Sequence, residues 1–172
     1  MNKKFNVSSY GTNTLISIPG PTGANNYDFG TTYAEIVANL KEQNHPYYTE
    51  RGILEMMERD ATIKEKPEKF SSTFDPKSRR YFDVIFTYSR TIMDKVISEF
   101  HSHGSSSFEL CTVINIETVD DHQNALVGAH RTLEIAKKLH ANKDDLIQVI
   151  DSLMDKFVNE DQLPLSYHVV AY

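Results

Sequence analysis

The sequence has little of what several classes of protein require. Its 172 residues include a single cysteine, Cys111, so an internal disulfide and a cysteine-rich zinc cluster are both excluded. No segment approaches the roughly 18 apolar residues needed to span a bilayer, and no apolar region follows Lys3 and Lys4 as it would in a signal peptide. The net charge of -6 lacks the basic excess typical of a large nucleic-acid footprint. We expect one globular domain, residues 1–172, from a reducing compartment.

Nucleotide and metal motifs are missing too. The sequence contains neither G-x-G-x-x-G nor G-x-x-x-x-G-K, and Gly20 to Gly23 is interpreted as a turn because no helix pattern follows it directly. His101 and His103 form half of a metal site at most, since no carboxylate–histidine pattern completes it. The residues alone therefore complete neither a nucleotide-binding motif nor a metal-binding motif.

What the sequence does contain is an alternation of strand and helix patterns. Residue alternation and short apolar runs predict strands over 4–10, 81–87, 108–116 and 167–170. Apolar residues at helical spacing predict helices over 32–40, 48–61, 92–100, 121–140 and 143–159. This order favours an α/β layered fold with a mostly parallel sheet.

The local signals for helix starts and loops are specific. Thr31 or Thr32 is expected to cap the first helix, with Glu35 completing a capping box, and Thr49 is expected to cap the second. Residues 19–30 are dense in turn-forming residues and are interpreted as loop. Residues 62–80 carry basic and acidic side chains in mixture, which favours a solvated connection over a phosphate-binding patch.

Ligands of open parallel sheets bind at the carboxyl ends of the strands, where three segments qualify: 11–30, the residues after Thr87, and 117–122. Asp120 and Asp121 follow a predicted strand and precede a predicted helix, with His122 beside them. Either aspartate could serve as a general acid or as the N-cap of the helix, and the residues alone favour the cap.

Cys111 lies inside an apolar run with no basic side chain near it in sequence to lower its pKa. A phosphate-binding cysteine loop would need an arginine six residues later, where this chain has Glu117, and no glycine occurs over residues 105–127. Cys111 is therefore interpreted as structural.

Several segments, in order along the chain, resemble the Ssu-seventy-two family of phosphatases. They are Phe5-Asn6-Val7-Ser8-Ser9-Tyr10-Gly11-Thr12, Ile18-Pro19-Gly20-Pro21, Asn26-Tyr27-Asp28-Phe29-Gly30-Thr31-Thr32-Tyr33, Tyr48-Thr49-x-x-Gly52-Ile53-Leu54-x-Met56, Pro67-Glu68-Lys69-Phe70, Phe82-Asp83-x-Ile85-Phe86-Thr87 and Asn115-Ile116-x-x-x-Asp120-Asp121-His122. Each segment alone is weak, but their common order and spacing are specific.

The resemblance implies a three-layered fold of the low-molecular-weight tyrosine phosphatase type and a cysteine-dependent protein serine phosphatase. Its implied substrate is the phosphorylated C-terminal heptad repeat of RNA polymerase II, with phosphoserine at heptad position five before a cis proline. It makes Asp120 the general acid, and places Ile18, Pro19, Tyr48 and Met56 along the peptide groove. It also implies a symplekin-type scaffold as a partner, roles in mRNA 3′-end processing and transcription termination, and a nuclear location.

The chain departs from the family pattern in one major respect. The family's nucleophile lies in Cys-x-x-x-x-x-Arg-Ser after a central first strand, and neither the motif nor that strand occurs in the 172 residues. We expect an incomplete gene model in which Met1 is internal to the first helix, and we expect the chain as it stands to be inactive. The alternative is a non-catalytic relative, a pseudophosphatase or scaffold-binding domain. Smaller departures are Ser17, Glu117 and the Thr87-Tyr88-Ser89-Arg90 segment.

Overall fold

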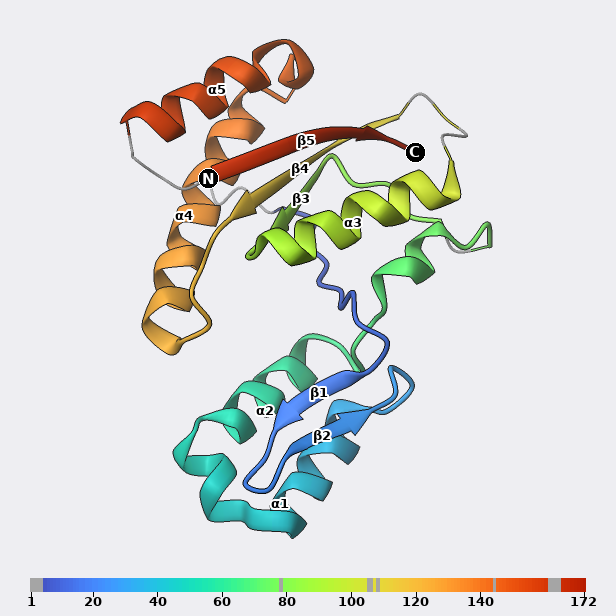
Figure 1. Ribbon diagram of the computed structural model, residues 1–172, viewed down its shortest axis with the longest axis vertical. Coiled ribbons are helices and arrows are strands. Elements are labelled where there is room, and N and C mark those ends of the chain that lie inside the picture. Colours follow the sequence, from blue (N-terminus) through green and yellow to red (C-terminus); the bar gives the residue numbers. More distant parts are fainter. Residues whose placement is uncertain (1–4, 78, 105–106, 108, 144, 161–164) are drawn as a thin grey trace. The chain divides into compact units, whose positions relative to one another are not determined.

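The computed structural model describes residues 5–77, 79–104, 107, 109–143, 145–160 and 165–172. Its chain divides into two compact units, Met1–Arg79 and Arg80–Tyr172, each with its own sheet (Figure 1). That residues 1–172 act as one domain stays a prediction. The α/β class is confirmed, with the element order β1 (Ile16–Pro19), β2 (Ala24–Tyr27), α1 (Tyr33–Glu50), α2 (Ile53–Ile63), η1 (Phe70–Phe74), β3 (Val84–Thr87), α3 (Arg90–His103), β4 (Leu110–Ile116), α4 (His122–Ala141), α5 (Leu146–Glu160) and β5 (Leu165–Ala171).

The N-terminal unit packs a hairpin on two helices. Strands β1 and β2 pair antiparallel from Ile16↔Tyr27 to Pro19↔Ala24, so the prediction that all of 19–30 is loop was wrong. The turn-forming residues of β2 join a strand because β1 satisfies their backbone groups. The core between hairpin and helices consists of Ile18, Tyr33, Ile36, Val37, Leu40, Tyr48, Leu54 and Met57.

The predicted capping box starts α1. Glu35 N–H donates to Thr32 Oγ1 at 3.2 Å, and Thr32 N–H donates to Glu35 Oε2 at 2.8 Å. The second helix prediction was wrong at its start: α1 continues past Pro46 to Glu50 after a break at Asn44, where φ is -164°. Proline is tolerated there because it lies in the first turn after the break. Gly52, with φ of 68°, and not Thr49, is the N-cap of α2.

The predicted strand over 4–10 is not present in residues 5–10, and Met1 to Lys4 lie outside the described residues. No strand among the described residues pairs with 5–10, and alternation alone does not make a strand without a partner. Val7 is 78% exposed. Just after this segment, Gly11 N–H donates to Glu68 O at 2.9 Å and the Gly11 carbonyl accepts from Phe70 N–H at 2.8 Å.

The connection predicted over 62–80 is solvated only in part. Phe70–Phe74 form the short 3₁₀ helix η1, and the rings of Phe70 and Phe74 are buried and pack edge to face with centroids 5.6 Å apart. Two phenylalanines among many charges are too few to give a periodic signal, so the sequence pattern did not reveal this anchor.

The C-terminal unit is built on a sheet of order β3-β4-β5. Strand β3 runs parallel to β4 and β5 runs antiparallel to it, so the sheet is mixed and the prediction of a mostly parallel sheet was wrong in this respect. The predicted strands over 81–87 and 108–116 are confirmed with shorter bounds, and Phe108 lies outside the described residues. The predicted tail strand is longer than expected because all seven residues of β5 pair with β4.

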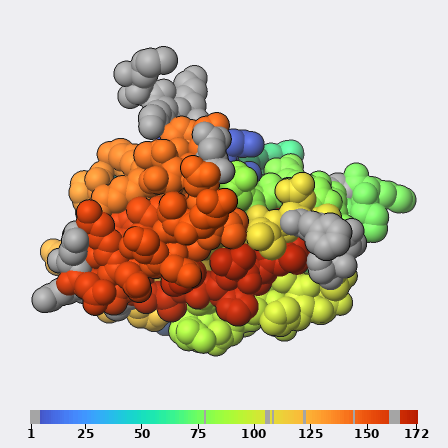
Figure 2. Space-filling model, turned by 90° about the horizontal axis from the view of Figure 1, so that it is seen from above, coloured from blue at the N-terminus to red at the C-terminus, as the bar shows by residue number. Residues whose placement is uncertain are grey.

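Helices cover both faces of this sheet, which confirms three layers (Figure 1). Because side chains alternate along a strand, Ile114 and Ile116 of β4 face one way and pack with residues of α4 and α5. Helix α3 contacts all three strands and buries Met93, Val96 and Phe100. Figure 2 shows the surfaces of α5 (orange-red) and β5 (dark red) adjoining on one face. The Tyr167 hydroxyl of β5 donates a hydrogen bond to the Asp151 carboxylate of α5.

Candidate functional site

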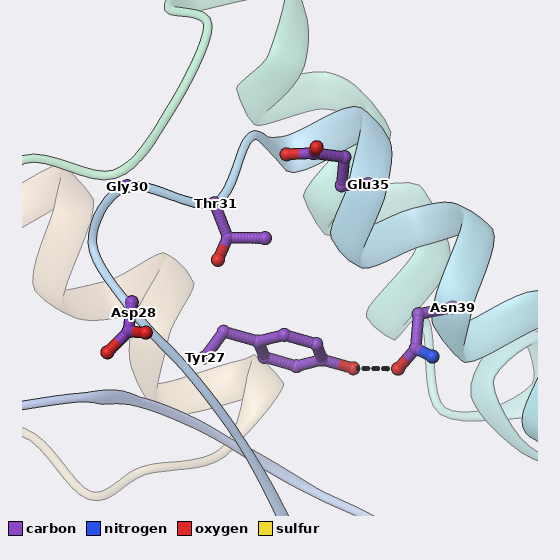
Figure 3. Close-up of a pocket in the computed structure, with 6 residues that line it drawn as sticks. All are labelled: Tyr27, Asp28, Gly30, Thr31, Glu35 and Asn39. Atoms are coloured by element: carbon purple, nitrogen blue, oxygen red, sulfur yellow. Dashed lines mark hydrogen bonds between the residues drawn. The ribbon is translucent and has the colours of Figure 1, made fainter.

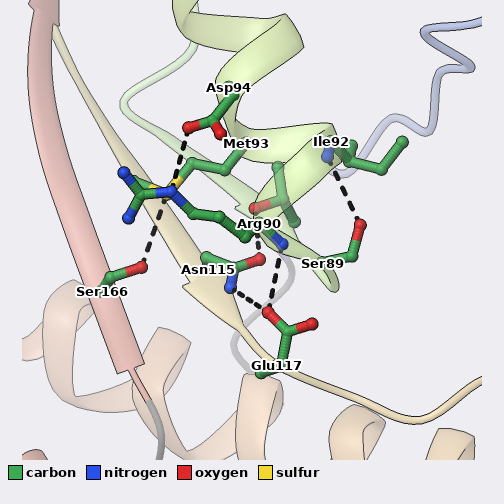
Figure 4. Close-up of polar contacts among 9 residues, drawn as sticks. Ser89, Arg90, Ile92, Met93, Asp94, Asn115, Glu117 and Ser166 are labelled. Carbon is green, nitrogen blue, oxygen red and sulfur yellow. Dashed lines mark hydrogen bonds and ion pairs between the residues drawn. The ribbon is translucent and has the colours of Figure 1, made fainter.

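A polar network lies at the carboxyl ends of the parallel strands β3 and β4 (Figure 4). Thr87 Oγ1 donates to Asn115 Oδ1 at 2.9 Å, and Asn115 Nδ2 donates to Glu117 Oε2 at 2.9 Å. The same Glu117 oxygen accepts from the backbone N–H of Arg90 at 3.1 Å. The network therefore joins the ends of both strands to the first turn of α3, where the helix dipole favours a carboxylate.

Beyond Glu117, the loop from β4 to α4 is held from two sides. Thr118 N–H donates to the carbonyl of Tyr88 at 3.1 Å, and Thr118 Oγ1 donates to the carbonyl of Ile116 at 2.8 Å. Asp121 N–H donates to Val119 O at 2.9 Å, which closes a tight turn just before the helix. The backbone of this loop is thus anchored although much of it is exposed.

The two neighbouring aspartates have different roles in this loop. Asp121 is the N-cap of α4: its Oδ1 accepts from Asn124 N–H at 2.8 Å, and its Oδ2 accepts from Asn124 Nδ2 at 2.6 Å. Asp120 is exposed, and no described residue hydrogen-bonds to its carboxylate. Asp121 is therefore the N-cap of the helix, and the role of Asp120 as a general acid stays a prediction. The side chain of His122 lies outside the described residues.

Cys111 is fully buried on β4. Burial raises the pKa of its thiol from the ordinary 9.0 to about 12, with the hydroxyl of Tyr172 opposing and Asp83 adding to the shift. Burial also raises the pKa of Tyr172, whose hydroxyl accepts from Phe82 N–H at 2.9 Å. A thiol so strongly protonated and enclosed does not supply a thiolate near neutral pH, which agrees with the structural interpretation.

The residues predicted along the peptide groove lie in the N-terminal unit. Ile18 and Tyr48 are buried, and the Tyr48 hydroxyl accepts from Asn25 Nδ2 at 2.7 Å. Pro19, at the end of β1, is exposed, and Met56 on α2 is 41% exposed. The substrate-binding roles of all four stay predictions.

The Tyr48 hydroxyl packs closely against Gly20, in the turn that follows Pro19. A Cβ placed on Gly20 would lie 2.9 Å from the Tyr48 hydroxyl and 2.7 Å from the carbonyl oxygen of Gly23. Only glycine fits at this position, so the buried tyrosine supports the shape of the turn that follows Pro19.

An open hollow of about 480 Å³ lies elsewhere on this unit (Figure 3). Tyr27 points across it and donates to Asn39 Oδ1 at 2.6 Å. Its carboxylates are Asp28 and Glu35, but the Thr32 backbone N–H and hydroxyl already bond to Glu35 and lower its pKa. None of the predicted site residues lines this hollow, so its size alone gives it no role.

Glu117, Asn115 and Thr87 form the polar network at the strand ends, although the sequence assigned none of them a role in a site. The signal available was their place: each lies at or just after the end of a predicted strand. That Asn115 and Thr87 lie directly opposite each other depends on the pairing of β3 with β4, which the sequence does not show.

In the described residues, no three histidine, cysteine, aspartate or glutamate side chains cluster as metal ligands. None of the described helices combines the length and apolar character of a membrane span.

The C-terminal unit is a three-layered α/β fold with an anchored acidic loop at the carboxyl ends of two parallel strands. It therefore belongs to the class of open-sheet α/β proteins, whose ligands bind at that edge of the sheet. Residues 1–172 match the family described as Ssu72-like protein. The chain belongs to the Ssu72 family.

Named relatives match over almost the whole chain. It is 33% identical over 170 residues to the RNA polymerase II C-terminal domain phosphatase SSU72 of Danio rerio, covering 98% of this chain and 84% of the relative. It is 34% identical over 172 residues to the protein of that name from Xenopus laevis, covering 99% and 86%. A crystal structure of D. melanogaster Ssu72 with Symplekin contains a cis peptidomimetic CTD peptide with phosphoserine at position five. That structure is similar with a TM-score of 0.89 and 31% identity, covering 98% of this chain and 85% of that one.

Proposed function

We propose that this chain belongs to a protein serine phosphatase that acts on the phosphorylated heptad repeats of the RNA polymerase II C-terminal domain. The relatives that match it over almost its whole length carry the name of that phosphatase. One observation in this structure carries the proposal: Asp121 is the N-cap of α4, whereas Asp120 is exposed on an anchored loop.

Asp120 is the proposed general acid. When the phosphoryl group is transferred from phosphoserine, the P–O bond breaks and the serine oxygen leaves. That oxygen needs a proton, and a carboxylic acid within hydrogen-bond reach supplies it. An acid on a fixed loop is effective because its carboxyl group is already in place when the bond breaks. The contacts of Glu117 and Thr118 described above hold the backbone on the N-terminal side of Asp120.

The proposed nucleophile is a cysteine thiolate, which needs neither metal nor organic cofactor. Cys111 does not fit that role because it is buried and its pKa is raised to about 12. The pattern Cys-x-x-x-x-x-Arg-Ser does not occur in the 172 residues. We therefore expect this chain, assayed by itself, to release no phosphate.

The proposed peptide groove is bordered by Ile18, Pro19, Tyr48 and Met56. Pro19 and Met56 are exposed and are the two that a peptide can contact directly. Ile18 and Tyr48 are buried, so their proposed contribution is to support the hairpin. The peptide in the Drosophila Ssu72 complex is a cis peptidomimetic phosphorylated on the serine at position five, which supports that phosphoserine as the ligand.

The proposed protein partner is a symplekin-type scaffold, and the proposed setting is transcription termination and mRNA 3′-end processing in the nucleus. The support is the Drosophila Ssu72 structure, which contains Symplekin. A non-catalytic, scaffold-binding role is the second candidate. It is favoured by one observation: the only cysteine of the chain is buried.

The test uses the 172-residue chain with a heptad peptide phosphorylated at the serine of position five and the same peptide unphosphorylated. We expect saturable binding of the phosphopeptide by fluorescence anisotropy, weaker binding of the unphosphorylated peptide, and no phosphate release. Equal binding of both peptides would contradict the proposal, and turnover that is lost in Cys111→Ser would overturn the interpretation of Cys111.

The two candidate functions are separated by the genomic sequence upstream of the Met1 codon. A strand pattern followed by Cys-x-x-x-x-x-Arg-Ser in frame supports the enzyme. A stop codon in frame, without that motif, supports the non-catalytic relative.

A further inference from the structure

Thr118 belongs to a closed ring of contacts that joins three segments of the C-terminal unit. The ring consists of Tyr88, Thr118, Gly128 and Thr132, and we refer to it as the Thr118 ring. Tyr88 comes from the turn between β3 and α3, Thr118 from the loop between β4 and α4, and Gly128 and Thr132 from α4. These segments are far apart in sequence, so the ring is a product of the tertiary fold.

The direction of each hydrogen bond in the ring can be assigned. Thr132 Oγ1 donates its single proton to the carbonyl of Gly128 at 2.8 Å. The Tyr88 hydroxyl lies 3.0 Å from the same Thr132 oxygen, and so it must be the donor of that bond. The carbonyl of Tyr88 in turn accepts from Thr118 N–H at 3.1 Å. Tyr88 therefore contacts both α4 and the loop before it.

Close packing completes the ring between Thr118 and Gly128. A Cβ on Gly128 would lie 3.0 Å from Thr118 Oγ1 and 3.1 Å from Thr118 Cγ2. A side chain at position 128 would thus push the loop away from α4, and the glycine lets the two approach. Gly128 is buried although the residues on either side of it in α4 are exposed.

We propose that the Thr118 ring positions Asp120, and that Tyr88 and Thr132 are positioning residues for this general acid. The inference rests on the proposed function for the role of Asp120. Thr118 is fixed by the ring, and Asp121 is fixed as the N-cap of α4 and by its bond to Val119 O at 2.9 Å. Only two residues, Val119 and Asp120, lie between these anchors, so the position of Thr118 limits where the Asp120 carboxylate can be.

A general acid needs a fixed position because proton transfer depends on distance. A general acid acts only within hydrogen-bond reach of the leaving oxygen, and a small displacement of a catalytic group lowers the rate strongly. Asp120 has no bond of its own to a described residue, so its placement depends on its backbone. The side chains of Tyr88 and Thr132 fix that backbone without touching the acid.

The test measures the loop directly, by amide hydrogen exchange and residual dipolar couplings on the 172-residue chain. The variants are Tyr88→Phe and Thr132→Val, which each remove one hydroxyl, their double variant, and Thr132→Ser, which keeps the hydroxyl. Tyr27→Phe is the matched control, because it removes a comparable tyrosine hydroxyl bond, that to Asn39, from the N-terminal unit. Gly128→Ala tests the packing contact separately.

We expect each single variant to lower the exchange protection of the Thr118 amide about three- to tenfold, as the loss of one exposed hydrogen bond implies. The dipolar coupling of the Asp120 N–H should change in the same variants. The double variant should be no worse than either single one, since the ring is already open. Thr132→Ser should behave like the parent chain, and Gly128→Ala should also shift the Asp120 coupling.

The proposal would be overturned by additive losses in the double variant, by an unchanged Asp120 coupling in all variants, or by an equal loss of protection in β4, which would mean general destabilisation. The same loss in Tyr27→Phe would also overturn it. Because no substrate is present, the result is independent of the phosphopeptide experiment. Failure of the ring and failure of the proposed function can therefore be told apart.

Discussion

Thr87 and Asn115 face each other across the ends of β3 and β4, and the hydroxyl of Thr87 donates to Asn115 Oδ1 at 2.9 Å. Both side chains are nearly inaccessible, at 3% and 2% exposure. The two side chains bond to each other and Asn115 also bonds to Glu117, so hydrogen bonds offset the cost of removing these polar groups from water. The pair therefore links the register of the sheet to the acidic loop.

The first prediction concerns this pair. Thr87→Val removes the donor and leaves the Asn115 oxygen buried without that bond, so we expect the free energy of unfolding to fall by about 1–3 kcal/mol. Thr87→Ser keeps the hydroxyl and is the control, with a smaller loss from its missing methyl. Urea unfolding at constant m-value measures both, and equal losses in the two variants would show that the hydrogen bond is not the cause.

The second prediction tests whether Glu117 stabilises the fold as a hydrogen-bond acceptor rather than through its charge. Glu117→Ala removes the acceptor of both the Asn115 amide and the Arg90 N–H, so unfolding should become easier by about 1–3 kcal/mol. Glu117→Gln keeps an acceptor oxygen, and its loss should stay below about 1 kcal/mol because a neutral acceptor is weaker than a charged one. Chemical denaturation decides, and a Gln variant as unstable as the Ala variant would contradict the anchoring role.

The third prediction divides the two aspartates. Asp121→Ala removes the N-cap of α4, which should cost about 1 kcal/mol of stability. Asp120→Asn alters an exposed side chain with no bond to a described residue, so its effect should stay within about 0.5 kcal/mol. Thermal or urea unfolding of the two variants measures the difference. A reversed order of stability would mean that the cap is misassigned.

The fourth prediction concerns Cys111 at alkaline pH. Its folded-state pKa, about 12, is above the ordinary 9.0, so the unfolded chain releases the thiol proton first as pH rises. The contribution to stability is complete below pH 9.0, declines above it and is lost as pH rises through about 12. Urea midpoints between about pH 8 and about 11 should therefore fall, and less steeply in Cys111→Ala, whose cavity costs the same at every pH.

Thiol reactivity gives a second measurement of the same burial. At about pH 8 the native chain should react with an aromatic disulfide reagent only at the rate of unfolding, and the urea-unfolded chain should react at once. Fast labelling of the native chain would contradict the placement of Cys111 within the core.

The fifth prediction uses two glycines of the N-terminal unit. Gly20→Ala places a Cβ 2.7 Å from the carbonyl of Gly23 and 2.9 Å from the Tyr48 hydroxyl, so the hairpin turn must shift, at a cost of about 1–3 kcal/mol. Gly30→Ala is the control, because no atom lies within 4 Å of its Cβ. Urea unfolding should show little change, or a small gain, for the control. An equal change in the free energy of unfolding of the two variants would show that a steric clash at position 20 is not the cause.

Much of the local structure could be predicted from the sequence because its causes are local. The capping box of Thr32 and Glu35 uses atoms three residues apart, so composition and spacing are enough to find it. The apolar runs of β3 and β4 and the stripes of α3 and α5 follow the same rule, since burial on one face imposes a period. In α4 the spacing misleads, because Leu126 and Leu133 lie at helical spacing but are 61% and 44% exposed. The residue pattern singled out the pair Asp120 and Asp121 because it follows a strand and precedes a helix, and the family resemblance made Asp120 the predicted general acid.

The tertiary structure decided what depends on partners. Residues 5–10 alternate like a strand, but no described strand pairs with them, and β2 forms from turn-rich residues because β1 lies beside it. Which aspartate caps α4 is settled by geometry that two adjacent carboxylates cannot reveal in sequence. The Thr87–Asn115 pair and the Thr118 ring join residues tens of positions apart. A sequence sets which side chains are available, whereas register and packing alone bring their atoms within bonding distance.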